Sequence, residues 1–190
     1  MDEETEPEND DRPDPQVEAR RRVALAQIRQ YPDPVLRMRA NDVEHFDDDL
    51  VRLVRRMTEL MHDAHGIGLA ANQVGVLQRL FVFLRDEDDE GTVIANPVII
   101  ARSDETDLDK EGCLSLQKIH VPVERNVAVT IEGQDPTGTP LRLELEDLPA
   151  RVVQHELDHL DGVLMIQRTD DEARRLALGI LRAQPVLGGR

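Results

Sequence analysis

The sequence predicts one α+β domain with antiparallel β-sheet, with one helix before the strands and another at the C-terminal end. The strand-like runs form a block between helical patterns and do not alternate with helices one by one. Within that block, apolar residues at every second position flank a turn signal, which is typical of a hairpin. This order favours antiparallel sheets over a repeating βαβ fold.

Length and charge limit the classes of function. A chain of 190 residues is long enough for one domain with its own core. The formal net charge is -16, from 23 basic and 39 acidic side chains, so the surface should repel nucleic-acid backbones. A single cysteine cannot form an intramolecular disulfide, and no stretch is typical of a signal region or a membrane span. We therefore expect a cytoplasmic protein without membrane or direct nucleic-acid binding.

Residues 1–22 are predicted to be a disordered acidic tail. The first 18 residues hold nine acids against Arg12 alone, and they include three prolines but almost no apolar side chains. Such a segment cannot bury enough surface to offset the entropy of ordering it. A solubilising extension is the simplest interpretation, and an interaction tail is the alternative. The catalytic domain is then expected over 23–184, with a C-terminal tail at 185–190.

The first strong helix of the domain is expected to begin at an Asp47–Asp48 cap and to end at Gly66. Its apolar residues recur at steps of three and four, as one buried helix face requires. They are Leu50, Val54, Met57, Leu60, Met61 and Ala64. Short strands should follow at 80–84 and 92–100, and Pro97 indicates that the second is interrupted or lies at an edge.

The hairpin comes next, with a turn at 135–138. Its alternating apolar residues are Val127, Val129 and Ile131 before the turn and Leu141, Leu143 and Leu145 after it. A helix over 147–160 should then stop at Gly162. The last helix is expected to open with a capping box from Thr169 to Glu172 and to end before Pro185.

The helix predicted over 147–160 contains the sequence Gln-His-Glu-Leu-Asp-His at 154–159. His155 and His159 are four residues apart, about 40° around a helix, so both imidazoles can reach one metal. Glu156 should project beside that metal, whereas Asp158 falls outside the reactive face and is given no catalytic role. The alternative is that both histidines are polar or core residues of an amphipathic helix.

A catalytic metal needs a third protein ligand and an open position for water. Two common zinc-protease patterns place this ligand downstream, but one requires His where this chain has Met165, and the other requires Glu where it has Gly179. The only cysteine, Cys113, stands upstream in the segment Glu-Gly-Cys-Leu-Ser at 111–115. By itself, a lone cysteine is more often a small buried apolar side chain than a metal ligand.

Three segments together resemble the signature motifs of peptide deformylases. They are Gly-Ile-Gly-Leu-Ala-Ala-Asn-Gln-Val-Gly at 66–75, Glu-Gly-Cys-Leu-Ser at 111–115 and Gln-His-Glu-Leu-Asp-His at 154–159. Their order and spacing agree with that family, and Tyr31–Arg37 is similar to its N-terminal part. The resemblance implies an α+β fold around a metal-bearing helix. It also implies a metal-dependent hydrolase that removes the formyl group from the N-terminal formyl-methionine of new polypeptides, releasing formate.

The resemblance further implies a role for individual residues. The expected metal ligands are Cys113, His155 and His159. The expected catalytic groups are Glu156 as acid and base, with the Gln73 amide and the Leu114 backbone N–H as donors to the formyl oxygen. The expected substrate-binding residues are Ile67, Gly68, Leu148 and Val152. As an alternative, Ile67, Leu148 and Val152 are equally suited to a plain core, and the glycines around Gly68 to a helix stop and turn.

The expected cofactor is one divalent metal ion. The resemblance favours Fe²⁺, although a thiolate with two imidazoles also suits Zn²⁺, Ni²⁺ or Co²⁺. The implied partners are formyl-methionyl N-termini of nascent polypeptides, met near the ribosome by a monomeric enzyme. A metal-dependent peptidase and a deformylase-like protein that only binds peptide or metal are the two other classes considered.

The chain departs from the family pattern at two places. Asn72 stands where proline is frequent, and Gln117-Lys118 stands where Pro-Gly is frequent. The second departure is expected to alter the loop beside the substrate and hence the side-chain preference. This second departure leaves the expected metal ligands untouched.

Overall fold

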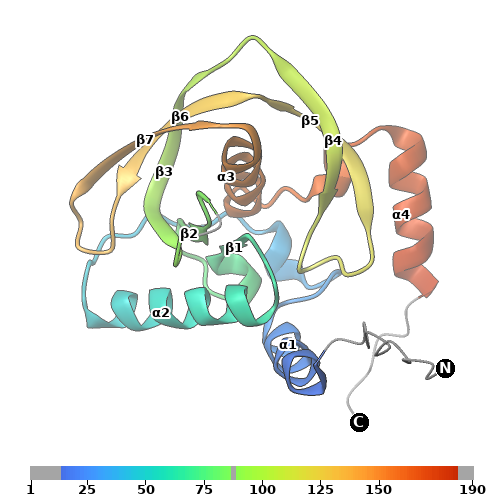
Figure 1. The fold of residues 1–190 in the computed structure, drawn as a ribbon, viewed down its shortest axis with the longest axis horizontal. Helices are drawn as coiled ribbons and strands as arrows, with labels where there is room; N and C mark the ends of the chain where they lie inside the picture. The colour runs from blue at the N-terminus through green and yellow to red at the C-terminus, as the bar shows by residue number, and fades with distance from the viewer. Residues whose placement is uncertain (1–13, 87–88, 184–190) are drawn as a thin grey trace, which may run out of the picture.

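The computed structural model describes residues 14–86 and 89–183. Within these ranges the chain forms four α-helices and two antiparallel sheets, and α3 lies in their middle (Figure 1). The helices are α1 (Pro15–Gln27), α2 (Asp48–Asp63), α3 (Asp147–Leu160) and α4 (Asp171–Ala183). Short 3-10 turns occur at η1 (Pro34–Arg37), η2 (Ala71–Val74) and η3 (Met165–Gln167). The predicted α+β class, with antiparallel sheets around a central helix, is confirmed.

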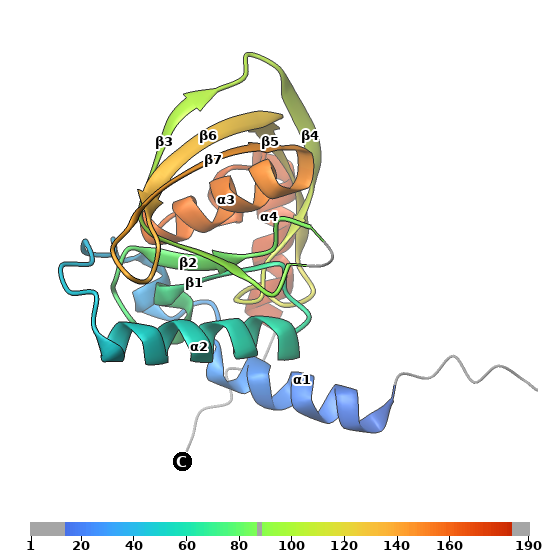
Figure 2. The ribbon, with the colours of Figure 1, turned by 60° about the vertical axis from the view of Figure 1, so that its left-hand side comes forward.

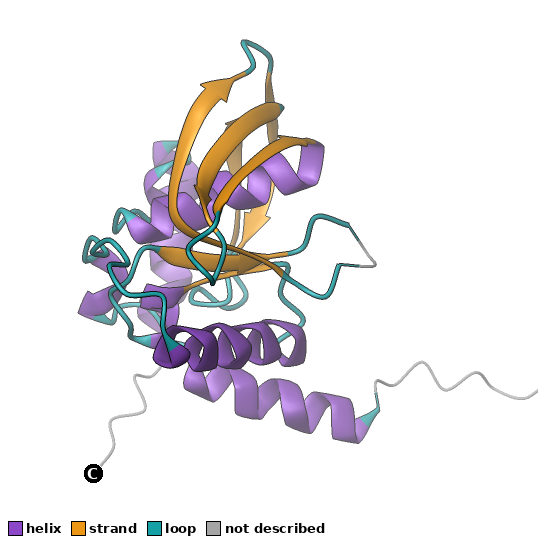
Figure 3. Cartoon of the chain, turned by 90° about the vertical axis from the view of Figure 1, so that its left-hand side faces the viewer, coloured by secondary structure: helices purple, strands orange, loops and turns teal. Residues whose placement is uncertain are grey.

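The larger sheet has the strand order β1-β2-β3-β6-β7, and the smaller one pairs β4 with β5. The strands are β1 (Gly68–Ala70), β2 (Leu80–Phe83), β3 (Thr92–Arg102), β4 (Thr106–Gly112), β5 (His120–Asn126), β6 (Ala128–Gln134) and β7 (Pro140–Glu146). Figure 2 shows the resulting layers: α1, then α2, then β1 and β2, then α3, with β3, β6 and β7 curving over it. In Figure 3, turned further, the strands form a wall around one helix.

Pro97 lies inside β3, which is a central strand rather than an edge. β2 pairs with β3 only up to Ala95, and the register between β3 and β6 shifts between Ala95 and Val98. A proline cannot donate to a neighbouring strand, so the irregularity falls where that donor is missing. The predicted interruption is therefore confirmed, and the edge position is wrong.

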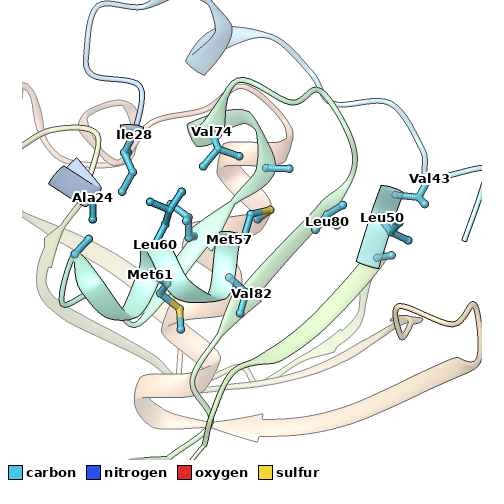
Figure 4. Packing of buried hydrophobic residues seen from close by; sticks show 14 residues of the cluster. Ala24, Ile28, Val43, Leu50, Met57, Leu60, Met61, Val74, Leu80 and Val82 are labelled. Atoms are coloured by element: carbon cyan, nitrogen blue, oxygen red, sulfur yellow. The ribbon is translucent and has the colours of Figure 1, made fainter. Parts of the chain in front are cut away.

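The predicted helix after Asp47 is confirmed as α2. The Asp47 side chain accepts hydrogen bonds from the backbone N–H groups of Asp49 and Leu50, which caps the first turn. One face of α2 packs beneath β1 and β2, together with residues of α1 and η2 (Figure 4). The labelled core residues there are Ala24, Ile28, Val43, Leu50, Met57, Leu60, Met61, Val74, Leu80 and Val82.

The N-terminal segment differs from the prediction of disorder up to residue 22. Helix α1 begins at Pro15, and the Asp14 side chain caps it by accepting from the Gln16 N–H. Proline at the first helical position and an aspartate cap together start a helix. α1 packs on α2 and buries Ala24. Ile28, the residue that follows the end of α1, is also buried. Residues 1–13 and 184–190 lie outside the described ranges, so the predicted tails remain a prediction there.

The hairpin and the last two helices follow the predicted order. β6 and β7 pair from Ala128↔Glu146 to Gln134↔Pro140. Helix α3 ends before Gly162, which adopts a φ of 73°. The predicted capping box of α4 is wrong in detail, because Asp170 rather than Thr169 accepts from the N–H groups of Glu172 and Ala173. None of the described helices combines the length and the hydropathy of a membrane span.

Candidate metal centre and substrate cavity

Helix α3 presents both histidines to one point beside β4. The ring centroids of His155 and His159 are 5.0 Å apart, and Cys113 follows directly after the end of β4. Ligand atoms of Cys113, His155 and His159 all lie within 4.8 Å of one another. Cys113 Sγ is 3.2 Å from His159 Nε2. The structure thus brings together the three residues that the sequence predicted as metal ligands.

This donor set fits a divalent transition metal. One thiolate and two imidazoles favour Fe²⁺ or Zn²⁺ over the hard, oxygen-seeking Mg²⁺ or Ca²⁺. His155 Nδ1 is hydrogen-bonded to Glu111 Oε2 at 2.9 Å, which leaves its Nε2 free to act as a ligand. His159 presents Nε2 to the thiol. The three side chains are held by a strand end and a helix.

The electrostatics of the centre favour one positive charge. Burial lowers the pKa of His155, but its hydrogen bonds with Cys113 and Glu111 outweigh burial and raise that pKa well above its ordinary value. Burial and the nearby His155 lower the pKa of His159 well below its ordinary value. The buried donors therefore retain one cationic charge rather than two, a charge that a bound metal would replace.

Glu156 lies next to the three ligand residues and is 3% exposed. Burial raises the pKa of Glu156 to about 7, and its Oε2 is buried without a hydrogen-bond partner among the described residues. Gly68 of β1 passes close by, since a Cβ at this position would overlap Glu156 Oε1. A carboxyl group with a pKa near neutrality can both take up and release a proton.

Gln73 is held in η2 with its amide nitrogen toward the centre. Its Oε1 accepts from the Ala70 N–H at 2.8 Å, and its Nε2 donates to Ser115 Oγ at 3.0 Å. The same Nε2 is 3.7 Å from Cys113 Sγ. Leu114 lines the same cavity, and its carbonyl oxygen accepts from Gln30 Nε2 at 3.0 Å. Both predicted donors are thus near the centre, and their role stays a prediction.

A cavity of about 520 Å³ opens onto this centre. The four predicted substrate-binding residues all line it: Ile67, Gly68, Leu148 and Val152. Val152 is buried, whereas Ile67 and Leu148 are 45% and 56% exposed. Because they are exposed, Ile67 and Leu148 belong to the surface of the cavity rather than to the hydrophobic core. Arg21 and Leu25 of α1 also line the cavity, although sequence reasoning placed Arg21 in a disordered tail.

Sequence reasoning missed a chain of buried charges behind the centre. Glu111, which binds His155, receives hydrogen bonds from Arg125 Nε at 2.9 Å and from Arg151 Nη1 at 3.1 Å. Arg125 also donates to Asp158 Oδ2 at 2.7 Å, and Asp158 is bound in turn by Arg168. Burial raises the pKa of Glu111, but its hydrogen bonds to His155 and Arg125 outweigh this and lower it to about 2. Glu111 is therefore ionised and orients the ligand His155.

Asp158 faces this chain of charges rather than the cavity, in agreement with the prediction that it lies outside the reactive face. The sequence offered one weak signal for the network, namely that Glu111 lies two residues before Cys113 in an extended segment. Its partners Arg125 and Arg151 are 14 and 40 residues away. No local pattern connects residues at such separations.

The two departures from the family pattern have clear positions. Asn72 is fully buried, and its side-chain amide donates to the carbonyl oxygen of His159, which ties η2 to α3. Gln117 donates to Gln30 Oε1 at 3.0 Å. Lys118 adopts a φ of 65° and lines the cavity. The second departure therefore lies beside the cavity, where it was expected to lie.

Comparisons with known proteins agree with this geometry. The family model described as polypeptide deformylase matches residues 25–175. Peptide deformylase 1 of Corynebacterium efficiens is 44% identical over 163 residues, covering 85% of this chain and 96% of that protein. The crystal structure of a peptide deformylase from Legionella pneumophila is 35% identical with a TM-score of 0.75, covering 83% of this chain and 98% of that one. The Thermotoga maritima peptide deformylase structure is 43% identical with a TM-score of 0.73, covering 75% and 96%.

Matches of this extent go beyond a shared fold, because they combine sequence identity with nearly full coverage of the relatives. The matched range also contains Cys113, His155, His159 and Glu156. The chain therefore belongs to the polypeptide deformylase family, metal-dependent hydrolases that remove the N-terminal formyl group from newly made polypeptides.

Proposed function

We propose that this enzyme deformylates formyl-methionyl N-termini with Cys113, His155 and His159 as ligands of Fe²⁺ and Glu156 as the acid and base. The observation that carries the proposal is the convergence of the three ligand atoms within 4.8 Å, beside a buried carboxyl group at the end of a cavity. A divalent cation held there would polarise the formyl carbonyl and lower the pKa of water from 15.7 to about 7, which supplies a nucleophile at neutral pH.

Glu156 moves the protons of the reaction. Its carboxylate takes a proton from the attacking water and then gives one to the departing amine nitrogen. Its pKa of about 7 in the absence of a metal suits both steps, since the group is neither a strong acid nor permanently protonated. Gly68 leaves room for Glu156 Oε1, and the burial of Glu156 restricts its carboxyl group. Such restriction keeps the proton-carrying oxygen near the reacting atoms.

Gln73 and Leu114 are proposed to stabilise the oxygen of the formyl group as it gains negative charge. The Gln73 amide is oriented by its bonds to Ala70 and Ser115, so it does not have to reorganise during the reaction. The Leu114 backbone N–H follows directly after the ligand Cys113. A donor of this kind typically contributes about 10²- to 10³-fold in rate.

The methionine side chain is proposed to lie against Ile67, Leu148 and Val152. These three apolar residues line the cavity next to Glu156, and an apolar wall favours the thioether chain over a charged side chain. Gly68 is proposed to allow the substrate backbone to approach β1 closely. The peptide would reach the enzyme as it leaves the ribosome, and the enzyme is proposed to act as a cytoplasmic monomer.

A single preparation made without oxygen tests the proposal. Formate release is measured with a formyl-Met-Ala-Ser peptide, and peptide-bond cleavage is measured with the same peptide lacking the formyl group. We expect formate from the first and no cleavage of the second. Metal analysis should find close to one Fe²⁺ per chain in the parent and much less in Cys113→Ala. Cleavage of the unformylated peptide, or full metal content in Cys113→Ala, would contradict the proposal.

A further inference from the structure

We propose that Arg21, Lys110 and Lys118 form a cationic rim on the substrate cavity that favours peptides with acidic side chains shortly after formyl-methionine. The inference rests on the function proposed above and specifies its substrate class. The three residues line the cavity from three different segments, namely α1, β4 and the loop between β4 and β5. We call them the cationic rim.

The cationic rim is positively charged, whereas the molecule as a whole is negatively charged. The chain has a formal net charge of -16 and contains only two lysines, Lys110 and Lys118. Both line this one cavity. An otherwise acidic surface repels an acidic peptide at long range. A local cluster of positive charges attracts only those acidic groups that come close to it.

The charged groups of the rim are available to a ligand. Within the described ranges, neither lysine ammonium group forms an ion pair or a hydrogen bond. Arg21 also lacks an acidic partner among those residues, and its Nε is buried without a hydrogen bond. Arg21 as a whole is only partly buried, and it lines the cavity. A carboxylate on the peptide would therefore be an acceptor for the charged groups that line the cavity.

The acids of the cavity do not neutralise the rim. Glu111 is already paired with Arg125 and Arg151. Glu156 is buried beside the three metal-ligand residues, where a bound cation would face it. The other cavity residues that carry a charge are the rim, the paired Arg151, and His155, which is hydrogen-bonded to Glu111 at the metal centre. The acidic groups that line the cavity therefore do not cancel the positive charges of the cationic rim.

The backbone at Lys118 supports a role for its side chain. Its φ of 65° lies in the left-handed region, which non-glycine residues other than Asn and Asp rarely occupy. Glycine would adopt this conformation without strain. A lysine therefore keeps a charge at the cavity at a conformational cost. Arg21 likewise lies before residue 25, where the match to the family begins. Arg21 thus lies outside the matched range, and Lys118 lies inside it at a position where the chain departs from the frequent glycine.

The expected preference is moderate. An exposed ion pair typically contributes about 0.2–1 kcal/mol, or roughly 1.4- to 5-fold in an equilibrium constant. Two acidic side chains that meet the rim should raise kcat/KM by about fivefold to tenfold over two basic ones. Because the rim lysines are exposed, 0.5 M salt should reduce the ratio to below about twofold.

The test compares formyl-Met-Ala-Glu-Glu, formyl-Met-Ala-Gln-Gln and formyl-Met-Ala-Lys-Lys as substrates of the metal-loaded full chain. Lys118→Gly removes one charge and relieves the backbone, so it should fold at least as well as the parent. Lys118→Glu reverses the charge. The matched control is Arg175→Glu, which changes the net charge equally at an exposed position on α4 outside the cavity.

We expect the Glu-Glu peptide to be preferred by the parent, the preference to shrink about twofold to threefold in Lys118→Gly, and to shrink further, to below about twofold, in Lys118→Glu, since Arg21 and Lys110 keep their charges. Arg175→Glu should keep the parent ratio. Equal kcat/KM for the three peptides, or the same change in Arg175→Glu as in Lys118→Glu, would overturn the cationic rim. Failure to release formate from any of them would instead contradict the function proposed above.

Discussion

Gly68→Ala tests whether Glu156 must be held in one place. A Cβ at position 68 would overlap Glu156 Oε1 and lie 2.9 Å from both Glu156 Cδ and Val152 Cγ1. Neither neighbour can withdraw easily, because both are buried on the central helix α3. Gly68 has no positive φ, so alanine is compatible with the backbone and the effect is purely one of space.

The size of the effect follows from this contact. Overfilling a packed site typically costs about 1–3 kcal/mol, which the protein can relieve by displacing the Glu156 carboxyl group. A positioned acid or base contributes about 10²- to 10⁴-fold, so we expect kcat to fall by about 10²-fold. The ligands are not displaced by this substitution, and metal content should stay close to one per chain.

The assay measures kcat and KM for formyl-Met-Ala-Ser together with bound metal and Tm. Gly179→Ala is the matched control, because a Cβ there has no heavy atom within 4 Å and lies in the exposed part of α4. This control should keep the parent kcat and gain a little helix stability. A Gly68→Ala enzyme with unchanged kcat and a raised KM would refute the reasoning, since it would show that Gly68 acts on substrate binding alone.

Three further predictions follow from other parts of the structure. Glu111→Gln removes the charge that orients His155, so metal affinity should fall by about 10- to 100-fold in a chelator competition, and parent-like affinity would contradict the role of Glu111. Leu148→Ala at a 56% exposed position should raise KM for formyl-methionyl peptides by about threefold to tenfold while Tm changes by less than about 2 °C; an unchanged KM would remove Leu148 from the methionine site. Asp89 has its pKa lowered to about 2, since hydrogen bonds from Thr92, Gly91 and Arg85 outweigh the effect of burial. Its stabilisation is therefore present above the ordinary pKa of 3.8 and is lost as the pH falls through about 2, so Asp89→Asn should destabilise the fold by about 1 kcal/mol at pH 7 and the difference should vanish near pH 2 in urea unfolding.

Periodic features of the chain could be predicted from the sequence. His155 and His159 share a helix face because their spacing is one turn, and the structure brings both to Cys113. The hairpin β6–β7 was predictable for the same reason, since its apolar residues alternate around a recognisable turn. Such signals are local, and each can be read from fewer than 20 residues.

Strand β4 could not be predicted in this way. Most of its residues are charged, and its one large apolar side chain, Leu108, is 66% exposed. β4 forms because it pairs along its whole length with β5, where Val121 and Val123 are buried in the core. Pairing with a partner strand overrides the local pattern.

The residues that complete the site come from contacts between distant segments. Gly68 touches Glu156, and Glu111 binds His155 across 44 residues. Helix α1 was missed because only Ala24 within it is buried, so its apolar periodicity is weak even though Asp14 and Pro15 form a good start signal. The position of Arg21 on the cavity follows only once that helix is in place.

The most direct test of the account is formate release by Glu156→Ala with its metal measured on the same oxygen-free sample. Glu156 is proposed to carry the protons but not to bind the metal, and it is not among the three ligand residues that converge within 4.8 Å. We predict close to one metal ion per chain and a loss of at least about 10²-fold in kcat with a formyl-Met peptide. A metal-loaded Glu156→Ala enzyme as active as the parent would contradict the proposed mechanism.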